Sequence, residues 1–439
     1  MEPSLNRTYE ALAATFAGHF PAQLSGPRTV GREAEFPVVD GSGRAADVAQ
    51  LWPLLQMAPG DLLKVKRDAV NSELVVGLDG SSYSYALEVG RGTIELNVGP
   101  SDTLFELEEL FRAGLARLVQ AAGQLGWRVL GYGVQPLTPA TRALLSPKQR
   151  YAALADIMGD DWVWYTVTAS DQLHVDVSRG EAVAVLNFAN LMAPVVVALC
   201  ANSPVVAGAL TGSCSSREAR MVDAVHGQRH GMIARPYADF TDFVARLSGM
   251  RSLLRREGER LLPDGRLFDE VLRADFGAGD TLAPGCFDAF LLHDHYVWHS
   301  ARLRSAYGTV ELRPACQQPP HEAMAAAALY LGLVEGRAEI TDYVQGALSP
   351  AGYWEGMMQY HRAAVRDGLA AEEPAAGFLA EVLTLAEKAL ARRGQGEERM
   401  LAPLWGRLER RENPAQRVAR VFVEEGVAGL VGVCEVGMG

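Results

Sequence analysis

The sequence predicts an α+β fold in which a mainly antiparallel sheet is flanked by helices. Segments with strand-like alternation dominate the first part of the chain, helical patterns interrupt them irregularly, and the region after about residue 321 is mostly helical. A regular alternation of strands and helices, which would indicate a doubly wound parallel sheet, does not occur. The 439 residues, 49% of them hydrophobic, can bury a large core, so we expect a single domain over residues 1–439.

Alternation of polar and apolar residues predicts the strands. Within the second alternating segment, Gly90 and Gly92 indicate a turn that divides it into two strands. Residues 203–236, rich in Gly, Ser and Arg, are expected to form a long loop at a site. The predicted strand segments are residues 28–40, 85–98, 127–135, 162–177 and 306–314.

Apolar residues that recur every three to four positions predict the helices. Residues 103–125 carry an apolar stripe, begin with a capping box of Thr103 and Glu106, and end at Gly126. Residues 180–201 are almost wholly apolar and predict one buried helix. Ala-rich runs at 322–337 and 375–393 indicate further helices in the C-terminal part.

The composition of the chain argues against some classes of function. The net charge of −12 (41 − 53) argues against a nucleic-acid partner, which would need clustered Lys and Arg. Residues 182–201 reach the length of about 20 residues that a membrane span needs, but Asn187, Asn190 and Pro194 within them favour a buried core helix and no membrane partner. Five cysteines without a C-x-x-C pair, and an N-terminus without a signal-type apolar core, indicate a reducing cytosol and a cytoplasmic protein.

Acidic side chains recur on one side of the predicted strands. Because residues two apart on a strand point the same way, Glu33 and Glu35 share a face. The same rule places Glu95 with Thr93 and Asn97, His174 with Gln172 and Asp176, and Glu311 with Thr309 and Arg313. A solvated outer face is the simpler interpretation for any one strand, but Lys is absent from all four faces.

Carboxylates gathered on one face repel each other unless cations are present. Oxygen-rich clusters with one imidazole suit Mg²⁺ or Mn²⁺ better than Zn²⁺. The residues therefore predict a divalent-metal site on this face of the sheet.

The remaining motifs give weaker indications of function. His293, His295 and His299 lack zinc spacing and are interpreted as structural. Cys316 has no histidine placed to activate it and is interpreted as inert. Neither a P-loop nor a G-x-S-x-G elbow occurs.

Several segments, in order, resemble the second, plant-like type of glutamate–cysteine ligases and their bacterial carboxylate–amine ligase relatives, in the glutamine synthetase-like superfamily. The resemblance covers about residues 28–335. Its motifs are GREAEFPVVD (31–40), YALEVGRGTIELNVGPSDTLFEL (85–107), SPKQRY (146–151), QLHVDVSRGEAV (172–183), ALCANSPVVAG (198–208), SSREARMV (215–222), RHGM (229–232) and GTVELRPAC (308–316).

The resemblance implies a curved, mainly antiparallel sheet with metal carboxylates on its inner face. It also implies an ATP- and Mg²⁺-dependent ligase (Mn²⁺ is possible) that joins the γ-carboxylate of glutamate to an amine through an acyl phosphate. Arg150 and Arg217 match positions that hold the α-carboxylate of glutamate, and Arg229 and Arg313 match basic groups at the phosphate or acyl phosphate. Its catalytic residues are then Glu311, Arg313 and Arg229, and its metal ligands Glu33, Glu35, Glu88, Glu95, His174 and Glu311.

The sequence also departs from the family. LEVGRGTIELNVGP replaces the Glu-Pro-Gly-Gly run of plant members, and His174 is closer to the bacterial relatives. Cysteine is the default amine, with another amino acid or amine of a specialised pathway as the alternative. A non-catalytic nucleotide- or metal-binding relative and a metal-dependent hydrolase are the other hypotheses. The expected partners are ATP and amino acids, and the expected state is a monomer or homodimer.

Overall fold

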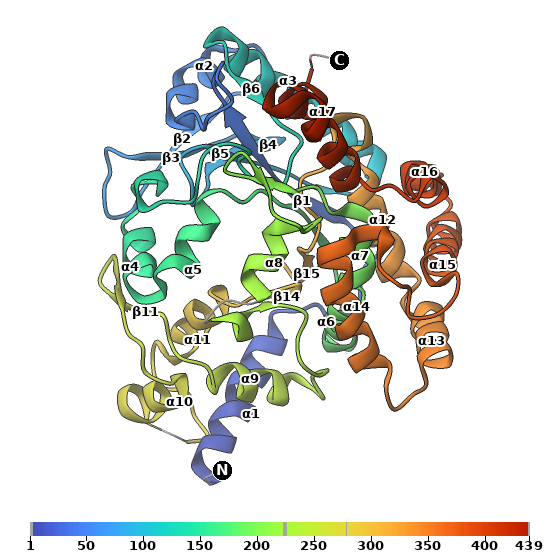
Figure 1. Cartoon of the computed structure of the whole chain (residues 1–439). Helices are drawn as coiled ribbons and strands as arrows, with labels where there is room; N and C mark the ends of the chain where they lie inside the picture. Colours follow the sequence, from blue (N-terminus) through green and yellow to red (C-terminus); the bar gives the residue numbers. More distant parts are fainter. Residues whose placement is uncertain (1–2, 223–225, 278, 438–439) are drawn as a thin grey trace.

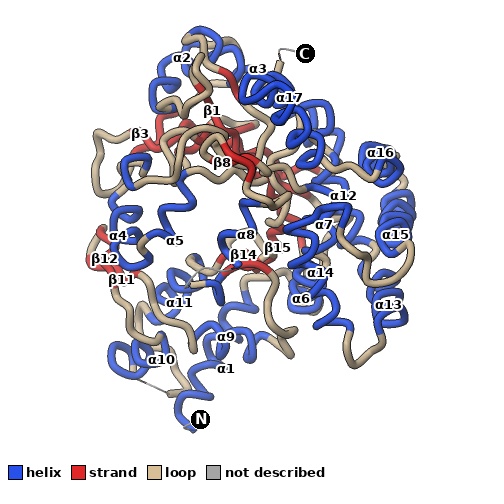
Figure 2. The backbone as a smooth tube through the Cα atoms, in the orientation of Figure 1, coloured by secondary structure: helices blue, strands red, loops and turns tan. Residues whose placement is uncertain are grey.

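The computed structural model describes residues 3–222, 226–277 and 279–437 and is built around a nine-stranded antiparallel sheet (Figures 1 and 2). The strand order is β14-β15-β7-β1-β5-β4-β3-β2, and β6 also pairs with β1. The α+β prediction with a mainly antiparallel sheet is confirmed. The strands are β1 (Val30–Val39), β2 (Lys64–Arg67), β3 (Val75–Asp79), β4 (Tyr83–Leu87), β5 (Thr93–Ser101), β6 (Arg128–Val129), β7 (Asp171–Asp176), β14 (Ala301–Arg304) and β15 (Thr309–Leu312).

Helices surround this sheet, and those of the C-terminal part gather along one side of the molecule (Figure 1). The first half contributes α1 (Pro3–Gly18), α2 (Trp52–Met57), α3 (Leu104–Gln124), α4 (Gln149–Met158), α5 (Asp160–Val163), α6 (Ala182–Leu191), α7 (Ala193–Cys200) and α8 (Ser216–Val222). The second half contributes α9 (Phe240–Ser248), α10 (Phe268–Val271), α11 (Cys286–His295), α12 (Ala325–Glu335), α13 (Arg337–Leu348), α14 (Tyr353–Asp367), α15 (Phe378–Arg393), α16 (Ala402–Arg410) and α17 (Pro414–Cys434). The helical C-terminal part was predicted.

The long helix α3 covers one face of the sheet. Half of the predicted capping box forms, because the Thr103 side chain accepts a hydrogen bond from the Glu106 N–H. The Glu106 carboxylate accepts from the Asp102 N–H in place of the Thr103 N–H that the capping box requires. Its Phe111 ring stacks on Phe36 of β1 and lies 3.9 Å from the Arg32 guanidinium. The even-numbered residues of β1 therefore face α3, and the odd-numbered ones face away from it.

Buried ion pairs join the sheet to later segments. Arg32 donates to Asp171 of β7 at 2.7 Å and to the Ala323 carbonyl at 2.7 Å. Both side chains of the pair are almost fully buried. The pair holds the two central strands against the segment that leads into α12.

Two strand predictions were too long. Of residues 127–135 only β6 is a strand, and of residues 162–177 only the last third, β7, is one. Gly159 adopts a φ of 59°, and Asp160 and Asp161 occupy the first turn of α5, which begins a helix where alternation predicted a strand. The alternation there reflects aromatic packing, because Trp162 contacts both Tyr151 and Trp298.

The predicted helix over 180–201 is two helices. Met192 separates α6 from α7, and Pro194 lies in the first turn of α7, where its missing N–H costs nothing. Every residue of α7 is buried, as predicted. Among the described residues, no one helix has the length and apolar character of a membrane span, although α6 and α7 taken together do, with a bend of 45° between them.

The predicted loop over 203–236 is partly structured. It contains α8 and three two-residue strands, β8 (Val205–Val206), β9 (Ala209–Leu210) and β10 (His230–Gly231). β10 pairs with β13 (Trp298–His299), and β11 (Leu254–Glu257) pairs with β12 (Arg260–Pro263) outside the main sheet. Strand β14 was not predicted.

Candidate active site

Strand pairing places the predicted acids on one face of the sheet. Residues directly opposite each other on antiparallel strands project to the same side. On β1 these are odd-numbered residues, so the acidic face is the one that α3 does not cover. The opposed pairs are Glu35 with Glu95, Glu33 with Gln172, and His174 with Glu311.

The acids form two compact groups. Within each group, one ligand atom of every residue lies within 4.8 Å of the others. Glu88 comes from the turn after β4, whereas the other members lie on strands. The first group is Glu33, His174 and Glu311, and the second is Glu35, Glu88 and Glu95. The fold thus brings together all six predicted metal ligands, and the carboxylate-rich donor sets fit Mg²⁺ or Mn²⁺.

The second group carries negative charge that nearby protein cations neutralise only in part. Burial, and then the charge of Glu88, raises the pKa of Glu35 to about 7. Burial and the charges of Glu88, Glu33 and Glu35 raise the pKa of Glu95 well above its usual value. A bound divalent cation would remove this repulsion, so the second group fits a metal on physical grounds.

The first group is largely neutralised by protein cations. Burial opposes ionisation of Glu33, but His174, whose Nε2 lies 2.9 Å from the Glu33 carboxylate, and Arg304 and Arg302 lower its pKa well below the usual range. Glu311, which is fully buried, pairs with Arg302 at 2.7 Å, with Arg304 at 3.3 Å and with Arg313. The demand for an added cation is therefore concentrated at the second group.

A cavity of about 230 Å³ opens between the two groups and a set of basic side chains. Of the predicted residues it is lined by Glu33, Glu35, Glu88, Glu95, Arg150 and Arg313. The sequence did not point to four further lysine, histidine or arginine residues of the lining, namely Lys148, His295, Arg302 and Arg304. The alternation in Ala301–Arg304, which places both arginines on one face, is the signal that would have found two of them.

The other two predicted arginines do not line this cavity. Arg217 lines a smaller neighbouring cavity of about 30 Å³, which shares Trp298 and Arg313 with the first, and its guanidinium pairs with Glu218 at 2.7 Å. Arg229 is 1% exposed and donates to the carbonyls of Tyr296 and Arg251. Its contacts therefore hold the chain beside the cavity.

Of the three histidines that were interpreted as structural, two contact backbone carbonyls and one lines the acidic cavity. The His293 Nε2 donates to the Leu247 carbonyl at 2.7 Å, and the ring stacks on Phe268. His299 contacts the Gln228 carbonyl at 3.0 Å. His295 instead lines the acidic cavity, so the structural interpretation does not extend to it.

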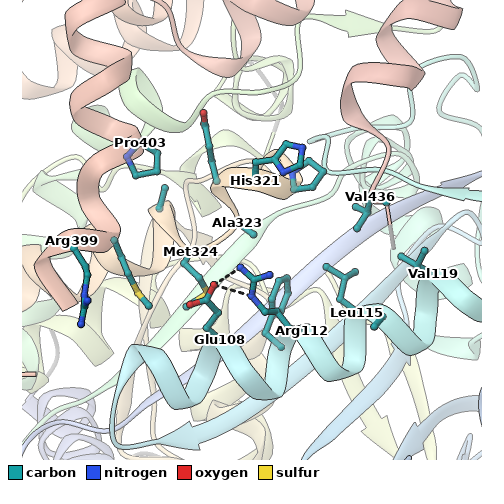
Figure 3. A pocket seen from close by; sticks show the side chains of 17 residues that line it. Glu108, Arg112, Leu115, Val119, His321, Ala323, Met324, Arg399, Pro403 and Val436 are labelled. Carbon is teal, nitrogen blue, oxygen red and sulfur yellow. Dashed lines mark hydrogen bonds and ion pairs between the residues drawn. The ribbon is translucent and has the colours of Figure 1, made fainter. Parts of the chain in front are cut away.

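A separate groove of about 530 Å³ lies against α3, on the far face of the sheet (Figure 3). Leu115, Val119 and Met324 line it, together with Arg112 and Glu108, which form an ion pair at 2.7 Å (Figure 3). No member of either acidic group lines it. The acidic cavity is therefore the candidate active site.

Comparison with known proteins was made at the level of family, sequence and fold. The family model described as glutamate-cysteine ligase family 2 matches residues 29–431. A protein of Thermobifida fusca named glutamate–cysteine ligase 2 is 31% identical over 168 residues, which are 37% of this chain and 42% of that protein. A Rubrobacter xylanophilus protein named glutamate–cysteine ligase 2-3 is 28% identical over 309 residues, which are 70% of this chain and 68% of that protein. The match to the Thermobifida protein thus spans less than half of its length.

Two solved structures share the fold. The glutamate–cysteine ligase of Francisella tularensis, solved in complex with AMP, has a TM-score of 0.59 at 11% identity and covers 94% of this chain and 88% of its own. A bifunctional glutathione synthetase from Pasteurella multocida has a TM-score of 0.53 at 12% identity and covers 98% of this chain and 53% of its own. At such identities the likeness concerns the fold alone.

Proposed function

This chain belongs to glutamate–cysteine ligase family 2, and from that premise we propose that it is an ATP- and Mg²⁺-dependent ligase that joins the γ-carboxylate of glutamate, or of a similar acid, to an amine. Cysteine is the first amine to test, and another amino acid or amine is the alternative. The AMP bound by the Francisella protein supports nucleotide use.

One observation carries the proposal: a single cavity combines carboxylates that are only partly neutralised with several basic side chains. Transfer of a phosphoryl group to a carboxylate brings two anions together, so a site for it needs cations around both. A site for a neutral substrate would need neither the carboxylates nor the basic side chains. We propose that Glu35, Glu88 and Glu95 hold the principal Mg²⁺, and that Glu33, His174 and Glu311 border a second metal position.

In the proposed reaction a carboxylate oxygen of the acid attacks the γ-phosphorus of ATP, and ADP leaves. The amine then attacks the acyl carbon of the acyl phosphate, inorganic phosphate leaves, and the nitrogen loses a proton. Bound Mg²⁺ would neutralise charge on the phosphate oxygens as it shifts.

The arginines have distinct proposed roles. Arg313, beside Glu311, donates to the oxyanions of the transferred phosphoryl group. Arg150 and Arg217 bind substrate carboxylates. Arg229 has a positioning role, since its guanidinium is committed to backbone carbonyls.

The test is ADP release from ATP and Mg²⁺ with glutamate and a panel of amines, with mass spectrometry of the product. Glu95→Gln should lower the rate by about 100-fold or more, because it removes one charge of the second group. Glu257→Gln is the matched control, since its side chain is 63% exposed on β11, and should keep the wild-type rate. ADP release without any amide product would favour the hydrolase hypothesis, and ATP binding without consumption would favour a non-catalytic relative.

We further propose, as the sequence led us to expect, that the protein acts in the cytoplasm on small molecules, as a monomer or homodimer, without nucleic-acid or membrane partners. Size-exclusion chromatography with light scattering would decide between the two oligomeric states.

A further inference from the structure

The imidazole of His174 is hydrogen-bonded at both ring nitrogens. Its Nε2 lies 2.9 Å from a Glu33 carboxylate oxygen, and its Nδ1 lies 3.0 Å from the Thr309 hydroxyl. Both His174 and Thr309 are buried. Among the described residues, this imidazole is the only hydrogen-bond partner of the Thr309 hydroxyl, so the hydroxyl can turn to donate or to accept as the ring requires.

Strand pairing fixes the place of Thr309 beside this imidazole. Glu311 of β15 lies directly opposite His174 of β7. Thr309 lies opposite Asp176, two residues further along β7, and is therefore the diagonal neighbour of His174 on the acidic face. The strand β15 thus carries both an acid of the first group and the hydroxyl that contacts the imidazole of that group.

The hydrogen bond to Glu33 closes Nε2 to a metal. An ionised carboxylate only accepts, so the proton of this bond lies on the Nε2 of His174. An imidazole binds a metal only through a nitrogen that carries no proton. A metal that binds there takes the place of the Nε2 proton, and the neutral ring then carries its proton on Nδ1. The Thr309 oxygen is the acceptor that this N–H can reach.

We propose that Thr309 is a positioning residue for the second metal position: its oxygen accepts from the Nδ1–H of His174 and so leaves Nε2 free to bind the metal. This inference rests on the proposed function, in which Glu33, His174 and Glu311 border that position. A hydroxyl both donates and accepts, so Thr309 keeps its bond to Nδ1 when the proton leaves Nε2. Valine has a similar shape but would leave a buried Nδ1–H without an acceptor, which favours the form that is closed to metal.

Binding of Mn²⁺, followed by electron paramagnetic resonance of the free and bound ion, tests this role without turnover. The wild type should bind Mn²⁺ at both proposed positions, and Glu95→Gln should weaken binding at the principal one, which identifies it. Thr309→Val should weaken binding at the second position about tenfold or more and at the principal position less than about twofold. Thr309→Ser keeps the hydroxyl and should stay within about threefold of the wild type at both positions.

The spin echo of bound Mn²⁺ gives an independent measurement, because a ligating imidazole nitrogen modulates it. The modulation should be present in the wild type and Thr309→Ser, and absent from Thr309→Val and from His174→Gln. Thr93→Val is the matched control. Thr93 is also a buried strand threonine, but among the described residues its hydroxyl has no hydrogen-bond partner, so this variant should bind Mn²⁺ as the wild type does.

Several outcomes overturn the role of Thr309. They are wild-type Mn²⁺ binding by Thr309→Val, equal weakening at both positions, no rescue by Thr309→Ser, or a wild type without the histidine modulation. Unchanged binding at the principal position shows that Thr309→Val is folded. If the threonine variants behave as expected but no amine supports ADP release, the ligase proposal fails and the role of Thr309 stands. If amide forms but Thr309→Val binds Mn²⁺ as the wild type does, the ligase proposal stands and the role of Thr309 fails.

Discussion

At the scale of single residues, two glutamates on one face are held in opposite electrostatic states. Glu311 is fully buried among three guanidinia. Glu95 faces other carboxylates, and burial together with their charges raises its pKa well above the usual value. Neutralising Glu311 and neutralising Glu95 should therefore have opposite effects on the free energy of unfolding.

We expect Glu311→Gln to destabilise the protein by about 3 kcal/mol, because it leaves three buried guanidinia around a neutral side chain. Glu95→Gln should be neutral or stabilising by about 1 kcal/mol in the absence of divalent cations, because it relieves repulsion. Urea unfolding of both variants and the wild type, with a chelator present, measures the difference. Equal losses of unfolding free energy in the two variants would contradict this assignment of charge.

At the scale of elements, the turn that carries Glu88 depends on one close backbone approach. A Cβ on Gly90 would lie 1.8 Å from the Thr166 carbonyl oxygen, so no larger residue fits between the turn and the segment before β7. Glycine signalled the turn in the sequence, but the partner backbone was not predictable because it lies more than 70 residues away. The strand predicted over 162–177 was wrong at this same segment.

Gly90→Ala should cost about 2–3 kcal/mol and lower ligase activity, since either the turn or the Thr166 segment must move. Gly123→Ala on α3 is the matched control. Its Cβ would meet nothing within 4 Å, and a better helix former should stabilise by up to about 1 kcal/mol. Thermal unfolding and ADP release measure both variants, and wild-type behaviour of Gly90→Ala would refute the close approach.

At the scale of the whole molecule, an ionic network ties the start of the sheet to the C-terminal helices. Arg28 pairs with Glu181 at 2.8 Å and lies 3.8 Å from Glu335 at the end of α12. Arg393 of α15 pairs with Glu335 at 2.7 Å and with Glu397 at 2.7 Å. These contacts join segments that are far apart in the sequence, and they accord with the single domain over residues 1–439, which stays a prediction.

This network predicts a pH dependence of stability. Burial opposes ionisation of Glu181, but hydrogen bonds from Arg28 and Ser178 lower its pKa to about 2. A lowered folded-state pKa contributes stability above the unfolded value near 4.5, and that contribution is lost as the pH falls toward 2. Glu181→Gln should therefore cost about 1–2 kcal/mol at pH 7, allowing for solvent screening, and close to nothing at pH 2.

Denaturant unfolding at the two pH values measures this effect. Glu339→Gln is the control, because its pair with Arg392 is about half exposed on both sides and should contribute less than about 0.5 kcal/mol at either pH. If Glu181→Gln lowered the free energy of unfolding equally at both pH values, the charge of the Glu181 carboxylate would not be the source of the stability.

The sequence by itself determined the elements and side-chain faces that depend on neighbours a few residues away. Two-residue alternation placed Glu33 with Glu35 and Glu95 with Asn97, and a local cap determined the start of α3. Only the tertiary structure decided which charges meet: Glu33 contacts His174 across 141 positions of sequence, and Glu311 is enclosed by arginines of an unpredicted strand. Periodicity and capping are local, whereas the counter-ion of a buried charge is set by which distant segments pack together.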